Sequence, residues 1–367
     1  MVGRVPNSRK APPVPLIRAV DRVRTGLQTL TRKLVPGNIA LLEIANGSWT
    51  TQALYVAAKL GIPDELVGGP LSAAEVARRV GADPDAVHRL MRALAGKGVF
   101  ELRRDGTFAL TSVGDAMRAD APGSIRGMIL LVGDPSHWEH WGNLLHSVKT
   151  GETAPMKLRG TNFFEYLDTN PELAVVFNDA MTSMSAMAID PVLATYDFSG
   201  FAEIVDVGGG HGSLLAAVLQ SAPNATGVLF DLPSVVEGAP AVLDAVGVGD
   251  RCTVSAGSFM DAVPDGGDAY LLKTIIHDWD EETALLILRN VRAAMGPAAK
   301  LLLLEMVLPE HDPAHFGTML DLEMLVIAGG KERTRSEYSN LLARAGFRLE
   351  RVVETAGPLS IVEAQTA

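Results

Sequence analysis

The chain has 367 residues, a formal net charge of −11 and 47% hydrophobic residues, which is enough apolar material for two buried cores. The acidic balance argues against a nucleic-acid-binding protein, and a single cysteine, Cys252, excludes an internal disulfide and a cysteine-rich zinc site. No apolar run reaches about 18 residues, and no signal-peptide core follows the first residues, so we expect a cytoplasmic chain without a membrane span.

The N-terminal segment is basic. Residues 1–42 hold eight basic residues against one acidic residue, and four prolines fall within the first 15 positions. Leucine and valine then recur at alternating intervals of four and three, which predicts a helix with one apolar stripe: Leu16, Val20, Val23, Leu27, Leu30 and Leu34. We expect residues 1–37 to be a basic, partly disordered leader whose amphipathic helix packs on a partner chain or on the chain's own core. A membrane-surface helix is the alternative.

Residues 38–115 have the pattern of a winged helix. An apolar helical stretch, 38–68, is stopped by the Gly-Ile-Pro-Asp sequence at 61–64. Its core candidates are Trp49, Leu54, Tyr55 and Leu60. Two short helices, 71–80 and 85–95, precede a hairpin that turns at Asp105-Gly106.

A winged helix can read DNA with its second helix. That helix offers His88, Arg89 and Arg92 but also begins with Asp83 and Asp85, on an acidic chain. A packing role for this domain is therefore favoured over DNA binding.

Residues 116–200 are predicted to be mostly helical and to be rich in methionine and aromatic side chains. These are Trp138, Trp141, Phe163, Phe164, Tyr166, Phe177, Met181, Met184 and Met187. At helical spacing such residues commonly form a core, but methionines also make adaptable walls for flat apolar ligands. Both interpretations stay open.

A glycine-rich turn organises the rest of the chain. A buried strand ends at Asp206, and Gly208, Gly210 and Gly212 follow before a helix begins. Glycines at a strand-to-helix turn let the backbone approach a ligand closely, and the helix N-terminus attracts negative charge. Because position 213 is Ser, the spacing departs from a dinucleotide fingerprint and matches Asp-x-Gly-x-Gly-x-Gly, the S-adenosylmethionine loop pattern.

A carboxylate at the right distance supports this assignment. The next predicted strand ends in Asp231, 19 residues after Gly212, where nucleotide-binding α/β folds place the acid that holds ribose hydroxyls. Otherwise the glycines would only make a turn and Asp231 would only cap the next helix. The loop and the acid together favour a binding site.

Strands and helices alternate after residue 203, which predicts a parallel sheet with helices on both faces and a hairpin at the end of the chain. Ligands of such sheets bind at the carboxyl ends of the strands. Those ends carry Gly208, Asp231, Ser258, Phe259, Lys273, His277 and Glu305.

His277 is the candidate general base, because it follows a central strand beside the predicted cofactor site. Alternatively, it is incidental to a loop in which Asp278 or Asp280 starts the next helix. Glu305 ends the following strand, and Glu332 lies in a polar loop, so either carboxylate could orient the imidazole and stabilise its charged form.

Four ordered segments carry a resemblance to a known family. They are Asp-Val-Gly-Gly-Gly-His-Gly, Phe-Asp-Leu-Pro, Leu-Lys-Thr-Ile-Ile-His-Asp-Trp and Gly-Gly-Lys-Glu-Arg-Thr. From about residue 38 to 363 the chain resembles the S-adenosylmethionine-dependent O-methyltransferases, in the branch that includes caffeate, flavonoid, acetylserotonin and polyketide-tailoring enzymes. This resemblance includes the winged-helix dimerisation domain.

The resemblance implies roles for individual residues. It implies that Gly208 and Asp231 bind the cofactor, with Phe259 beside the adenine and Lys273 near it. It implies that His277 is the base, flanked by Glu305 and Glu332, and that Met181 borders the acceptor. We add Gly210 and Ser258 to the cofactor set, although relatives usually have Asp at position 258. We add Phe177, Trp138 and Asp278 to the acceptor pocket, and we expect no metal.

The sequence therefore predicts an α/β fold with a Rossmann-like methyltransferase domain, a mostly parallel seven-stranded sheet, after a mainly α-helical winged-helix dimerisation domain. The expected boundaries are 1–37 for the leader, 38–115 for the winged helix, 116–200 for the acceptor-pocket segment and 201–367 for the cofactor domain. We expect a homodimer that methylates a hydroxyl of an aromatic or polyketide-like molecule. The alternatives are an S-adenosylmethionine-binding hydroxylase or decarboxylase on this fold, and an S-adenosylmethionine-responsive DNA-binding regulator.

Overall fold

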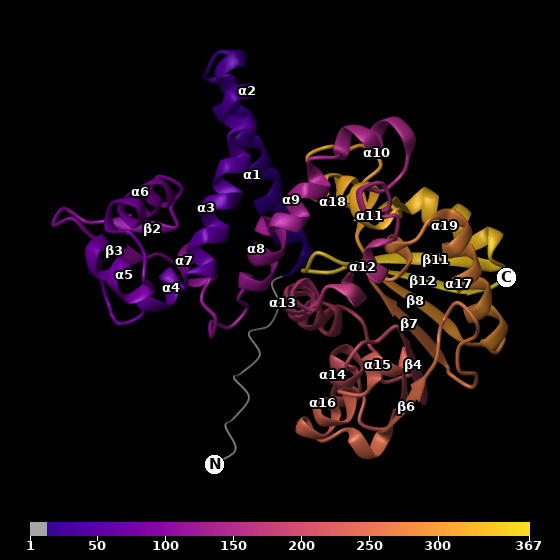
Figure 1. Cartoon of the computed structure of the whole chain (residues 1–367). Coiled ribbons are helices and arrows are strands. Elements are labelled where there is room, and N and C mark those ends of the chain that lie inside the picture. The colour runs from indigo at the N-terminus through magenta and orange to yellow at the C-terminus, as the bar shows by residue number, and fades with distance from the viewer. Residues whose placement is uncertain (1–12) are drawn as a thin grey trace. The chain divides into compact units, whose positions relative to one another are not determined.

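The computed structural model describes residues 13–367, which form two compact units (Figure 1). One unit comprises residues 146–153, 187–367 and the described residues up to Val23, and the other comprises 24–145 and 154–186. The disorder predicted for the start of the leader falls on residues that lie mostly outside the described range. Within residues 13–367, no helix is both long and apolar enough to cross a bilayer.

A seven-stranded sheet forms the centre of the first unit, in the order β11-β12-β8-β7-β4-β5-β6. The strands are β4 (Glu203–Val207), β5 (Thr226–Asp231), β6 (Cys252–Ala256), β7 (Ala269–Lys273), β8 (Lys300–Glu305), β11 (Phe347–Glu354) and β12 (Ser360–Thr366). The neighbours from β8 to β6 are parallel, whereas β12 is antiparallel to both β8 and β11. The predicted fold class and the terminal hairpin are therefore confirmed.

Both faces of this sheet are covered, because apolar residues alternate along its strands. In β8, Leu302 and Leu304 join one core, and Leu301 and Leu303 join the other. The first core includes residues of α14 (Ser213–Ser221), α16 (Ala239–Ala245) and the end of α13 (Pro171–Thr195). The second includes residues of α17 (Glu281–Ala294) and α19 (Arg335–Arg344). The central strands are thus held firmly, and their carboxyl ends can present side chains in fixed positions.

Short elements complete this unit. They are most of α10 (Leu144–Thr150), α15 (Pro233–Val236), η1 (Gly249–Arg251), η2 (Ile276–Asp278), β9 (Val307–Leu308), α18 (Gly317–Glu323), the π-helix η3 (Met324–Ala328) and β10 (Arg333–Thr334). The strands β9 and β10 pair in parallel, with Arg333 opposite Val307. This pairing brings the chain after β8 next to the segment that contains Glu332.

The second unit contains the predicted winged helix. Its elements are α5 (Ala73–Val80), α6 (Pro84–Ala95) and the sheet β1-β3-β2, formed by β1 (Leu71–Ser72), β2 (Phe100–Leu102) and β3 (Thr107–Leu110). Asp83 caps α6 by accepting a hydrogen bond from the backbone N–H of Ala86, as its place before Pro84 predicts. The winged-helix prediction is confirmed.

The remaining helices of the first 170 residues were predicted in outline. They are α1 (Val14–Lys33), α2 (Gly37–Ala45), α3 (Gly47–Lys59), α4 (Ile62–Glu65), α7 (Ser112–Asp115), α8 (Arg126–Gly133), α9 (Pro135–Trp141), α11 (Ala154–Arg159) and α12 (Phe163–Thr169). Gly61 follows α3 in a left-handed conformation (φ 68°). The helical structure resumes directly after it, because α4 begins at Ile62.

One predicted core residue lies on the surface. Leu54 and Leu60 pack against the core beneath the winged helix, whereas Trp49 is 72% exposed. The predicted stripe from Leu16 to Leu34 is also exposed along its whole length. Placing Trp49 in the chain's own core was wrong, because an apolar helical surface without a partner has the same sequence pattern as a buried one.

Candidate active site

The glycine loop follows β4 directly. Gly208, Gly210 and Gly212 have φ of 69°, 62° and 82°, a region that side chains with a β-carbon rarely adopt. A β-carbon at position 210 would meet nothing within 4 Å, so the loop is open on that side. The sequence Asp-x-Gly-x-Gly-x-Gly therefore forms the exposed backbone turn that a closely approaching ligand needs.

Asp231 joins the two halves of this site. Its Oδ2 accepts a hydrogen bond of 2.8 Å from the backbone N–H of Gly210, and its Oδ1 accepts one of 2.7 Å from Leu232. The carboxylate at the end of β5 thus holds the glycine loop of β4. Asp231 does not cap the next helix, because the N-cap of α15 is Leu232.

A buried carboxylate lies beneath the loop. The Oδ2 atom of Asp206 is buried and has no hydrogen-bond partner. Burial raises the pKa of Asp206 to about 7, with the Lys273 cation opposing the shift and Asp231 adding to it. Burial likewise lowers the pKa of Lys273, against the pull of Asp206, Glu305 and Asp278. The glycine loop covers Oδ2 of Asp206, because a β-carbon at Gly209 would come within 2.6 Å of it.

The other predicted cofactor residues are close to the loop or near its edge of the sheet. A β-carbon at Gly208 would lie 3.4 Å from the ring of Phe259, so this ring borders the loop. The Phe259 and Trp279 rings are in edge contact, with centroids 6.1 Å apart. Ser258 accepts a hydrogen bond from the backbone N–H of Met260, so its hydroxyl shapes the turn after β6.

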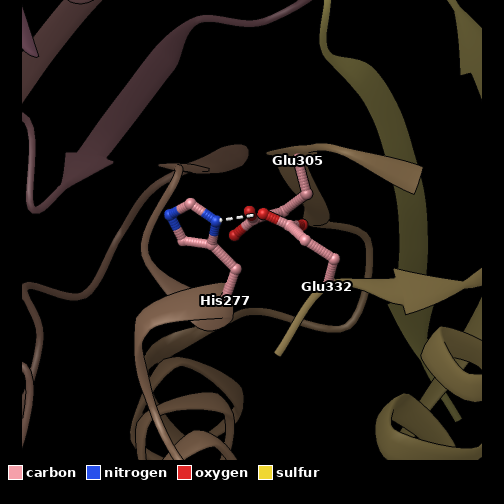
Figure 2. A group of neighbouring side chains, drawn as sticks. All are labelled: His277, Glu305 and Glu332. Carbon is pink, nitrogen blue, oxygen red and sulfur yellow. Dashed lines mark hydrogen bonds and ion pairs between the residues drawn. The ribbon is translucent and has the colours of Figure 1, made fainter. Parts of the chain in front are cut away.

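His277, Glu305 and Glu332 come together from three segments (Figure 2). The Nδ1 atom of His277 lies 2.7 Å from Oε1 of Glu332, and both side chains are buried. The Oδ1 atom of Asp278 lies 3.4 Å from Nε2, the other ring nitrogen. The imidazole is therefore oriented through Nδ1, and Nε2, beside the Asp278 carboxylate, is the nitrogen that Glu332 does not engage.

The charges around His277 decide its protonation. Burial disfavours the imidazolium, but the charges of Asp278, Glu305 and Glu332 and the hydrogen bond to Glu332 outweigh it and raise the pKa of His277 to about 10. The ring is thus the doubly protonated imidazolium at neutral pH when no other cation is near.

Glu305 contacts the backbone rather than the imidazole. Its Oε1 accepts hydrogen bonds from the N–H groups of Ile275 (3.2 Å) and Ile276 (2.9 Å), so it fixes the turn that leads to His277. Burial raises the pKa of Glu305 to about 7, against the attraction of His277. One atom from each of His277, Glu305 and Glu332 lies within 4.8 Å of the others, a spacing that could also suit a cation. In this structure Nδ1 and both Oε1 atoms have protein partners instead.

The turn between β7 and η2 contains a strained residue. Thr274 has a φ of 52°, and it is the one described non-glycine residue with positive φ. Left-handed backbone is unfavourable for a β-branched side chain. The turn is held by hydrogen bonds from Thr274 N to Leu304 O and from its Oγ1 to Lys273 O. This strained turn directs the chain from the strand to His277.

The predicted acceptor residues Trp138, Phe177 and Met181 belong to the second unit. The Phe177 ring packs against Phe163, with centroids 5.4 Å apart, and Trp138 donates a hydrogen bond from Nε1 to Val132 O. Met181 is half-buried in α13. Their place beside an acceptor stays a prediction.

Sequence reasoning did not single out two residues of the segment around Glu332. Arg333 is fully buried, and Gly330 lies against the backbone of residues 277–279. The Gly-Gly-Lys-Glu-Arg-Thr segment has the composition of an exposed loop, so composition gave no signal for either. The one available signal was the position of Arg333, directly after a candidate catalytic carboxylate.

Comparison with known proteins identifies the class. A model of the O-methyltransferase domain matches residues 141–348, and a model of the O-methyltransferase dimerisation domain matches residues 42–120. The chain therefore belongs to the O-methyltransferase family, and the resemblance found in the sequence is confirmed.

Individual relatives agree over most of the chain. The phenazine O-methyltransferase of Lysobacter antibioticus is 44% identical over 331 residues, covering 90% of this chain and 97% of the relative. The crystal structure titled LaPhzM has a TM-score of 0.85 at 44% identity and covers 91% of this chain and all of its own. An O-methyltransferase from neocarzinostatin biosynthesis, solved with S-adenosylmethionine and 2-hydroxy-5-methyl naphthoic acid, has a TM-score of 0.75 at 34% identity, with 87% and 96% coverage.

The chain is an S-adenosylmethionine-dependent methyltransferase, as the sequence predicted. The residues at the sheet edge fit this cofactor, which brings hydroxyls and an ammonium group. The open glycine turn leaves room for a ligand, and the buried carboxylate of Asp206 lies beneath it.

Proposed function

We propose that this chain transfers a methyl group to a hydroxyl of a small aromatic or polyketide-like acceptor and that His277 removes the hydroxyl proton. The observation that carries the proposal is the contact of 2.7 Å between His277 Nδ1 and Glu332 Oε1. It orients the ring so that Nε2 can face an acceptor. The predicted cofactor residues lie at the same carboxyl edge of the sheet.

Relatives support an aromatic acceptor. One is named 3-amino-4-hydroxybenzoate 4-O-methyltransferase (38% identical), and another is named 2,7-dihydroxy-5-methyl-1-naphthoate 7-O-methyltransferase (34%). Two others, at 36% and 33%, are named N-methyltransferases, so the family members differ in the atom they methylate. A hydroxyl is proposed here because His277 provides a base, which an oxygen nucleophile needs more than a free amine does.

The chemistry divides simply between cofactor and chain. Bound S-adenosylmethionine supplies an activated methyl group on a sulfonium. The acceptor oxygen forms the new bond to this carbon as the carbon–sulfur bond breaks, and the hydroxyl proton moves to Nε2 of His277. Glu332 holds the proton on Nδ1 and stabilises the imidazolium that results, while Glu305 keeps the turn in place.

Base action requires a neutral ring at the moment of transfer. In the free chain the pKa of His277 is about 10, close to that of a phenol at about 10, so proton transfer between the two is nearly balanced. A ligand cation beside the cluster lowers the pKa of His277, which favours the neutral ring at some cost to this balance. Phe259, Asp231 and the glycine loop bring the cofactor to this edge of the sheet.

Replacing His277 with Ala tests the proposal. We expect turnover to fall by about 10²–10⁴-fold, the range for a positioned general base. S-adenosylmethionine should bind His277→Ala at least as tightly as wild type in calorimetry, because the variant lacks the imidazolium charge that opposes the cofactor cation. Transfer of labelled methyl to a panel of phenols and anilines, with and without a chelator, is the assay. Near-normal turnover of His277→Ala at neutral pH would place the base elsewhere, and loss of activity with chelator would point to a metal.

We also propose a homodimer formed through the winged-helix domain at 38–115 and the leader helix, with the acceptor pocket in 116–200. The dimerisation-domain match at 42–120 and the exposed apolar stripe of α1 support the first part. The concentration of aromatic residues around Phe163, Phe164 and Phe177 supports the second.

A further inference from the structure

Arg333 is a buried charge that the proposed chemistry does not use. Its side chain is 1% exposed and ranks first by volume among the fully buried side chains of the described residues. Burying a guanidinium is costly unless its donors find acceptors. Its contacts therefore indicate which parts of the structure it holds.

One nitrogen of Arg333 joins the two segments of the catalytic pair. Its Nη1 donates to the carbonyl oxygen of Ile276 at 3.1 Å and to that of Lys331 at 3.2 Å. Ile276 precedes His277, and Lys331 precedes Glu332. The guanidinium thus links the backbone beside the imidazole to the backbone beside its carboxylate partner.

Other contacts also hold the loop at 329–334 in place beside the turn that carries His277. A β-carbon at Gly330 would overlap the carbonyl oxygen of His277 and come within 2.6 Å of Trp279 N, so the two backbones touch. The N–H of Glu332 donates to Asp321 Oδ1 at 2.9 Å. Arg333 itself pairs with Val307 through β10 and β9. The loop at 329–334 is therefore fixed on the turn that carries His277, with Arg333 as its side-chain link.

We propose that Arg333 is a positioning residue that holds Glu332 within hydrogen-bonding distance of His277 Nδ1. It acts through its hydrogen bonds to the two carbonyl groups. Its effect on turnover rests on the proposed role of His277 as the base, whereas its effect on the His277–Glu332 contact does not.

The test replaces Arg333 with Lys and with Met. A lysine ammonium lacks the rigid guanidinium plane that fixes Nη1 against both carbonyls, and methionine donates nothing. Loosening the contact should lower the pKa of His277 by about one unit or more, because the ring loses its nearest carboxylate while Asp278 and Glu305 remain. The readout is an NMR pH titration of the histidines in the full chain without cofactor, with the His277 signal assigned from His277→Gln.

Gly330→Ala gives an independent variant, because it pushes the same two backbones apart from the other side. It should shift the His277 titration in the same direction. Arg251→Lys is the matched control. Arg251 also binds backbone carbonyls, those of Leu219, Ala222 and Ala225, but these lie at the amino-end side of the sheet, away from His277. It should lower stability without moving the His277 titration.

The outcomes separate the two proposals. If Arg333→Lys and Gly330→Ala both leave the His277 titration unchanged, the positioning role is wrong, whatever happens to stability. If the titration shifts and turnover falls at least tenfold without weaker S-adenosylmethionine binding, Arg333 positions a working base. If the titration shifts but His277→Ala turns over normally, the link is real and the base assignment fails.

Discussion

Three carboxylates face His277 from three parts of the chain, and their charges outweigh the effect of burial on the ring. Asp278 is its neighbour in η2, Glu305 ends β8, and Glu332 precedes β10. A His with an ordinary pKa near 6.5 would be a poor base for a phenol, whose pKa is near 10. The cluster removes most of that difference by stabilising the imidazolium.

Replacing Glu332 with Gln should lower the pKa of His277, because the amide keeps a hydrogen-bond acceptor but loses the charge. The pKa of His277 in the folded chain lies above its unfolded value of 6.5, so its contribution to stability is complete below pH 6.5 and is lost as the pH rises through about 10. Glu332→Gln should therefore flatten the fall in stability between these two pH values.

Urea unfolding at several pH values measures this effect. Glu282→Gln is the control, since it removes the same charge from an exposed position at the start of α17. A wild-type stability that stays level from pH 6.5 to 10 would contradict the assigned environment of His277.

Asp231→Ala should weaken S-adenosylmethionine binding. A ribose hydroxyl left without its acceptor costs about 1–3 kcal/mol, or roughly five- to a hundred-fold in affinity. The change also removes the acceptor for the Gly210 N–H, which adds to the loss. Calorimetry measures the affinity, and Asp265→Ala, which removes an exposed carboxylate, is the control. Equal affinities in Asp231→Ala and wild type would reject Asp231 as a cofactor residue.

At the scale of single elements, the strands and their ends were predictable because the apolar pattern is regular. Glycines mark the turn after β4, and a carboxylate marks the end of β5. The contacts of Glu305 and Arg333 could not be predicted, because both depend on backbone groups that only the folded turn brings near. Thr274 gave no signal either, since threonine is typical of strands and not of left-handed turns.

The β7–η2 turn provides an element-scale prediction. Thr274→Asn should raise the free energy of unfolding by roughly 1 kcal/mol, because asparagine tolerates the left-handed region that threonine avoids. The same substitution in an ordinary extended strand, Thr253→Asn in β6, should lower or leave it unchanged. Denaturant unfolding of both variants is the measurement. A destabilised Thr274→Asn would mean that the Thr274 hydroxyl bond to Lys273 O outweighs the strain.

At the scale of the whole molecule, the exposed apolar surface of the first helices predicts self-association. Besides the α1 stripe it includes side chains of α2 and α3: Ile39, Leu41, Leu42, Ile44, Trp49 and Val56. A monomer would leave this surface in water, at about 25 cal/mol for each Å² that a partner could cover. The mistaken placement of Trp49 has the same origin, because a sequence pattern does not say which chain buries a residue.

Light scattering should therefore report twice the chain mass of 38.9 kDa. Leu27→Asp should shift the chain toward the monomer, because a charge in the stripe cannot be buried without a partner. Leu286→Asp, at an exposed apolar position of α17, should leave the mass unchanged. A wild-type chain that is monomeric and fully active would overturn the homodimer proposal.

The close approach of Gly330 to the backbone after His277 also bears on how this enzyme can vary. In a saturation library of residues 329–334, position 330 should retain glycine in nearly every active clone, whereas Lys331, whose side chain is 42% exposed, should accept many substitutions. Mutational tolerance would then change sharply between adjacent codons. Efforts to broaden the acceptor range should accordingly begin elsewhere, since this loop allows almost no diversity at the residue that touches the backbone of His277.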